Sequence, residues 1–181
     1  MQPTMRVVSG AVLALALTFP ALASAQDSKS APLAKQLAAA MESAKLDSIA
    51  AKDGAAADVF VAALYFPGQL LVVSGKYSVP QLLNERLGKK EYRDVYMDLN
   101  GAASPDSKVF IQDPGADGLK AKREENQAFD IVEIHGKQTM FNSDWKAQKL
   151  SEQDYQKAFS DADERYAQIL AALLGQVKKT S

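Results

Sequence analysis

The stretch VFVAALYFPGQLLVVSGK, residues 59–76, decides the fold. Val59–Phe66 is almost entirely apolar, and Leu70–Val73 is a second aliphatic and β-branched run. Between them, Pro67-Gly68 places proline before a residue that tolerates positive φ, as a tight turn requires. The stretch therefore predicts a β-hairpin. Both arms are apolar on both faces, so we expect the hairpin inside a sheet, with a helix on one side and further protein on the other.

Two elements are expected before this hairpin. Pro32 opens the Ala-rich stretch 33–44, whose apolar residues recur on one face and predict an amphipathic helix with proline in its first turn. Residues 46–52 could continue that helix, or could form a strand that ends in the Asp53-Gly54 turn. We favour the strand.

Several shorter elements are expected after the hairpin. Ser78 and Gln81 have the spacing of a capping box, and Gly88 ends the short helix that follows. Alternation over 93–99 predicts a half-exposed strand, and 108–112 another.

A second hairpin is expected over 128–142, with His135-Gly136 as its two-residue turn. This turn would place Ile131 opposite Met140 and Val132 opposite Thr139. His135 is the only histidine in the chain, and we interpret it as a polar turn residue rather than a catalytic base.

A long C-terminal helix is expected from Glu152, after the cap residue Ser151. About 26 residues follow the helical period, which corresponds to a length of roughly 39 Å. Core packing is the favoured interpretation of its apolar stripe. The length leaves open a second interpretation, in which the stripe binds a second copy of the chain or an envelope protein. The residues of that interaction surface are Tyr166, Ile169, Leu173 and Val177.

The order of elements predicts an α+β fold with a mainly antiparallel sheet or a small barrel, an N-terminal helix, a short middle helix and a long C-terminal helix. Residues 26–31 are small and polar and are expected to be a mobile linker. One globular domain is expected over residues 32–181.

Residues 1–25 have the pattern of a cleavable signal peptide. Arg6 precedes the apolar core Val7–Phe19, and Ala23-Ser24-Ala25 supplies small residues for cleavage after Ala25. The apolar core is shorter than the roughly 20 residues that a membrane-spanning helix needs. We therefore expect export to the periplasm or the medium, with no membrane anchor after cleavage.

Composition excludes several classes of function. The 181 residues include 21 Lys+Arg and 22 Asp+Glu, a net charge of −1, so no basic field favours nucleic-acid binding. There is no cysteine, which excludes disulfides, thiol nucleophiles and thiolate metal sites. No Gly-x-Ser-x-Gly nucleophile motif occurs. The leading hypothesis is an exported, non-catalytic binding or interaction protein of unknown ligand.

One segment partly matches a calcium-binding loop. Asp113, Asp117 and Glu124 occupy the first, fifth and twelfth positions, and Gly118 the sixth. Lys120 stands where an apolar residue normally anchors such a loop. We favour a solvated turn without an ion, with these three acids as the metal-ligand candidates.

The order of elements around 46–100 resembles the FMN-binding split-barrel superfamily, the pyridoxamine phosphate oxidase-like proteins. The shared features are the Asp53-Gly54 turn, the Pro67-Gly68 turn and a polar strand exit. The resemblance implies that the exit binds the flavin phosphate, and its residues here are Ser74, Lys76 and Ser78. The family's further Lys or Arg is replaced by residues 79–81, Val-Pro-Gln. We expect no cofactor from the residues themselves; FMN and a split-barrel oxidoreductase are the alternative that the resemblance implies.

Overall fold

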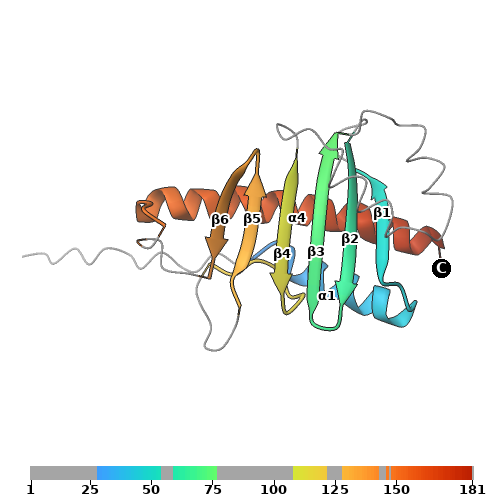
Figure 1. Ribbon diagram of the computed structural model, residues 1–181. Coiled ribbons are helices and arrows are strands. Elements are labelled where there is room, and N and C mark those ends of the chain that lie inside the picture. The colour runs from blue at the N-terminus through green and yellow to red at the C-terminus, as the bar shows by residue number, and fades with distance from the viewer. Residues whose placement is uncertain are drawn as a thin grey trace, which may run out of the picture.

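The computed structural model describes residues 28–53, 59–76, 108–121, 128–142, 146 and 148–180 (Figure 1). These residues form a six-stranded antiparallel sheet and two helices, so the predicted α+β class is confirmed. The elements are α1 Ser30–Ser43, β1 Ser48–Lys52, β2 Val59–Phe66, β3 Gln69–Lys76, β4 Val109–Pro114, β5 Asp130–Ile134, β6 Lys137–Phe141 and α4 Glu152–Thr180.

The strands pair in chain order, β1 to β6, each antiparallel to the next. The β2–β3 hairpin lies inside the sheet, and Gly68 has the positive φ of 75° that the Pro67-Gly68 turn requires. Residues 48–52 form a strand, as favoured. Among the described strands, β1 and β6 are the two edges of an open sheet. The resemblance to the split-barrel superfamily stays a prediction.

The β5–β6 hairpin turns at His135 and Gly136, whose φ angles are 50° and 74°. Two successive positive φ angles are typical of the type I′ turn, whose twist matches that of the flanking strands. The predicted register is confirmed, because Ile131 pairs with Met140 and the next residue, 132, with Thr139.

Both helices lie on the same face of the sheet, and α4 crosses the strands from the β6 side to the β1 side (Figure 1). At the β6 side, the ring of Phe141 lies edge-on to Tyr155 and Phe159, with centroids 5.7 and 5.5 Å apart. α4 has 29 residues, three more than predicted, and α1 packs along it.

The predicted interaction surface on α4 is wrong as a surface of the folded chain. Tyr166, Ile169 and Leu173 are fully buried and Val177 is 5% exposed, all in the core between α4, α1 and the sheet. An amphipathic stripe has the same period whether it covers a sheet of its own chain or a partner. The burial of all four residues supports the interpretation that the stripe belongs to the core.

The β2 and β3 strands are buried on both faces, as predicted from their continuous apolar runs. Val61 and Val72 lie in the core beneath the helices, whereas Phe60, Ala62 and Val73 are buried on the opposite face. Strand alternation accounts for this division, because successive side chains point to opposite faces.

The expectation of a mobile linker over residues 26–31 is wrong for residues 28–31. α1 begins at Ser30, two residues before Pro32, and Ser30 is fully buried. The cause is a carboxylate from α4: Asp163 Oδ1 accepts from Ser28 Oγ at 2.7 Å and from Ser30 Oγ at 2.6 Å. Residues 26 and 27 lie outside the described residues.

Other expected elements are also outside the described part of the chain, namely the signal peptide at 1–25, the middle helix at 78–88 and the strand at 93–99. Neither α1 nor α4, the two helices described, has an apolar stretch long enough to cross a bilayer.

Candidate functional site

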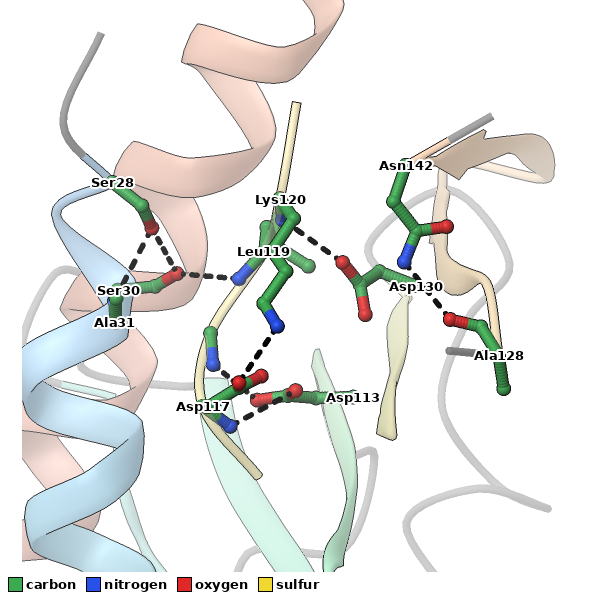
Figure 2. Close-up of polar contacts among 11 residues, drawn as sticks. Ser28, Ser30, Ala31, Asp113, Asp117, Leu119, Lys120, Ala128, Asp130 and Asn142 are labelled. Atoms are coloured by element: carbon green, nitrogen blue, oxygen red, sulfur yellow. Dashed lines mark hydrogen bonds and ion pairs between the residues drawn. The ribbon is translucent and has the colours of Figure 1, made fainter. Parts of the chain in front are cut away.

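Asp113, at the end of β4, is the centre of a buried polar cluster (Figure 2). Its carboxylate is fully buried and accepts hydrogen bonds from the Gly118 N–H at 2.9 Å and the Asp117 N–H at 3.3 Å. The Tyr166 hydroxyl of α4 donates a third bond at 3.0 Å. Burial raises the pKa of Asp113 to about 6, against the opposing effect of these donors.

Asp130, at the start of β5, binds the same loop from the other side. Its Oδ2 accepts from the Lys120 N–H at 2.9 Å, and burial raises its pKa to about 7, with the charges of Asp113 and Asp117 adding to the rise. Asn142 extends the cluster, because its backbone N–H donates to the Lys120 carbonyl at 2.7 Å. Loop 115–121 is therefore held between two buried carboxylates.

The same loop contacts the first turn of α1 closely. Gly118 has a φ of +87°, and a Cβ there would lie 2.4 Å from the Ala31 Cα, so only glycine fits. The Leu119 N–H donates to Ser30 Oγ at 3.0 Å (Figure 2). These contacts join β4, β5, α1 and α4 around the loop. The polar cluster therefore stabilises the fold at the place where these four elements meet.

The structure brings two of the three metal candidates together. Asp117 and Asp113 lie on one turn, but the Asp117 carboxylate already forms an ion pair with Lys120 Nζ at 2.8 Å (Figure 2). Glu124 lies outside the described residues. Within the described ranges, no three acidic or histidine side chains are arranged to hold a metal ion. Calcium binding by this segment stays a prediction.

Ser74, the first residue of the predicted phosphate site, lies fully buried against α4. Arg165 donates to Ser74 Oγ at 2.9 Å and forms an ion pair with Asp53, whose side chain is 1% exposed. Lys76 is exposed at the end of β3, and Ser78 lies outside the described residues. No local sequence pattern indicates Arg165 as a partner of Ser74, because the two residues are 91 positions apart in the chain. FMN binding stays a prediction.

A pocket of about 370 Å³ lies between the β5–β6 hairpin and α4. Its volume is at the small end of the roughly 300–1,000 Å³ range of ligand sites. The residues that line it are Val132, Ile134, His135, Lys137, Thr139, Phe141, Ala158, Asp161 and Ala162.

The pocket exists because α4 changes side-chain size along its sheet-facing side. Tyr155 and Phe159 fill the space against Phe141, whereas Ala158 and Ala162, one helical turn apart, leave a hollow beside the hairpin. The sequence contained both parts, the hairpin and two alanines on the helix. The sequence does not indicate that the hairpin and these alanines lie side by side, because their proximity depends on where α4 crosses the sheet.

The floor and the opening of the pocket differ in chemistry. Val132, Phe141 and Ala162 are buried by at least 98%, and they form an apolar floor. His135 and Lys137 from the hairpin are exposed, so they lie at the opening. Apolar walls with a few polar groups at the opening are also typical of small-molecule sites in general.

Comparison of this chain with known protein families, with curated proteins and with solved structures finds no match.

Proposed function

We propose that this protein is an exported, non-catalytic binding protein for a small ligand, and that the ligand occupies the pocket between the β5–β6 hairpin and α4. The observation that supports the proposal is the concave apolar site of about 370 Å³ with a polar opening. Its walls belong to a hairpin and a long helix that also form the core. Such rigid walls reduce the ordering cost of binding. The proposal of export, to the periplasm or the medium, rests on the signal-peptide pattern of residues 1–25.

The lining supports binding better than catalysis. It contains one hydroxyl, one imidazole and one carboxylate that could act chemically, those of Thr139, His135 and Asp161. No hydrogen bond joins these three described side chains to one another. Acyl transfer by such groups needs a nucleophile, a base and an orienting acid that are hydrogen-bonded in series. The lining therefore offers an orienting surface rather than a linked catalytic set.

A neutral fluorescent probe, N-phenyl-1-naphthylamine, tests the proposal. Its fluorescence should rise saturably when it is titrated with the mature protein. Ala158→Leu should abolish the rise, because the larger side chain fills the hollow. Ala39→Leu is the matched control, since Ala39 is exposed on α1. Equal probe binding by Ala158→Leu and wild-type protein, both verified as folded by circular dichroism, would refute the pocket as the site.

A further inference from the structure

We infer that the ligand of this pocket is a small amphipathic monocarboxylate, with its apolar body on the floor and its carboxylate at Lys137. This inference rests on the proposed function and specifies the class of ligand. It follows from three features of the lining: the apolar floor, the position of Lys137 at the opening, and the presence of the Asp161 carboxylate in the same lining.

The floor selects an apolar body. Val132 is 2% exposed and Phe141 is fully buried, and Ile134, Ala158 and Ala162 complete a surface of aliphatic and aromatic carbon. Each methylene that the ligand buries on this floor adds to the favourable free energy of transfer from water. A short alkyl or aryl group can therefore gain most of its affinity there, whereas a sugar or a nucleotide would leave hydroxyl and phosphate groups without partners.

The opening selects a negative charge. Lys137 is exposed at the rim and, within the described part of the chain, makes no ion pair. His135 precedes it across the tight turn and adds a ring that can donate a hydrogen bond to the same anion. An ammonium beside an apolar hollow matches a ligand whose anionic group stays at the water interface.

Asp161 limits the ligand to a single charge. Its carboxylate lies on the α4 side of the opening and already pairs with Lys157 Nζ at 2.7 Å, one turn earlier. Lys137 is then the cation left for the ligand. A dianionic phosphate would bring a second negative charge to an opening that already contains the Asp161 carboxylate, and like charges in one opening oppose binding. A monocarboxylate satisfies Lys137 without that penalty.

Isothermal titration calorimetry of the mature protein with octanoate and 1-octanol tests this inference, because the two probes share a chain and differ in charge. Octanoate should bind about fivefold more tightly than octanol, the ratio that one exposed ion pair supports. Lys137→Met should remove this preference without weakening octanol. Lys35→Met, an exposed lysine on α1, is the matched control and should leave the preference intact. The preference should also fall at high salt.

The results separate this inference from the function on which it rests. Equal affinity for octanoate and octanol, unchanged by Lys137→Met, would overturn the monocarboxylate class while the pocket still binds. Tighter binding of octyl phosphate than of octanoate would also overturn it, in favour of a phosphate. Failure of both octanoate and octanol, together with failure of the neutral fluorescent probe, would overturn the binding function itself.

Discussion

Asp163 should be among the most sensitive polar positions in this chain, because one carboxylate of α4 caps the start of α1. Its Oδ2 accepts from the Lys29 N–H at 2.6 Å, and its Oδ1 from the Ser30 N–H at 3.1 Å. Oδ1 also accepts from the hydroxyls of Ser28 and Ser30. The residue before α1, Lys29, supplies no side-chain cap of its own. Helix N–H groups in the first turn have no partner within the helix, so Asp163 replaces the missing cap.

Asp163→Ala should lower the free energy of unfolding by about 2 to 4 kcal/mol. Loss of an N-cap alone costs about 0.5 to 2 kcal/mol. The remainder reflects burial, because Asp163 is 4% exposed and its donors would lose a charged acceptor, worth about 1.5 to 3 kcal/mol for such a bond. For a domain of this size, each kcal/mol lowers the melting temperature by about 2 to 4 °C, so a fall of roughly 5 to 15 °C is expected.

Urea denaturation followed by circular dichroism measures this loss, and two variants provide the comparison. Glu164→Ala removes the neighbouring acid, whose exposed ion pair with Lys29 is open to solvent, and should change stability far less. Asp163→Asn retains an oxygen for the Ser28 and Ser30 donors but places an amide group near the Lys29 N–H. It should fall between wild type and Asp163→Ala.

Two results would refute the capping argument. The first is an equal loss of stability in Asp163→Ala and Glu164→Ala, which would show that the four hydrogen bonds carry no more than an exposed ion pair. The second is unchanged amide hydrogen exchange at Ser30 in Asp163→Ala, because the loss of an N–H acceptor must reduce local protection.

Three further outcomes are expected. Arg165→Met should lower the free energy of unfolding by about 3 kcal/mol in urea denaturation, because it removes the cation that pairs with the buried Asp53 carboxylate. Adding Asp53→Asn should recover much of that loss by removing the buried charge, and equal stability of the single and double variants would contradict the argument. Burial raises the pKa of Asp130 to about 7, so between about pH 4 and pH 7 the folded chain retains a proton that the unfolded chain has lost. The contribution of this group to the free energy of unfolding is therefore complete below about pH 4 and is lost as the pH rises through about 7. The stability of Asp130→Asn relative to wild type should therefore increase as the pH rises from about 4.5 to about 7.5. A difference in melting temperature between the two proteins that does not change with pH would refute this. Gln148→Ala should promote self-association in sedimentation velocity, because it exposes backbone groups of the edge strand β6. The Gln148 side-chain amide accepts from the Met140 N–H at 2.8 Å and donates to the Met140 carbonyl at 2.5 Å. A variant that stays monomeric at every concentration would show that the edge is protected by other means.

The hairpins could be predicted from the sequence because their causes are local. Pro67-Gly68 and His135-Gly136 specify turns through backbone preferences, and alternation then determines which residues face each other. This is why the pairing of Ile131 with Met140 was predicted correctly. The extent of α4 was likewise close, because helical period and end charges are properties of neighbouring residues.

The features that the sequence does not predict depend on contacts between residues far apart in the chain. The start of α1 depends on Asp163, 133 residues from Ser30, and a polar N-terminal segment without that partner has the composition of a linker. The Asp53 and Ser74 site depends on Arg165, at a similar sequence distance. No local pattern contains these pairs, because they form only when α4 lies across the sheet.

The sequence by itself therefore determined the β2–β3 and β5–β6 hairpins with their turns, the β5–β6 register and the existence of a long amphipathic helix. Only the tertiary structure decided that the apolar stripe of that helix is core, and that Ala158 and Ala162 face the β5–β6 hairpin across a hollow. The physical reason is the range of the interactions. Backbone preferences and side-chain periodicity act over a few residues, whereas a pocket is the space left where two distant elements cross with small side chains between them.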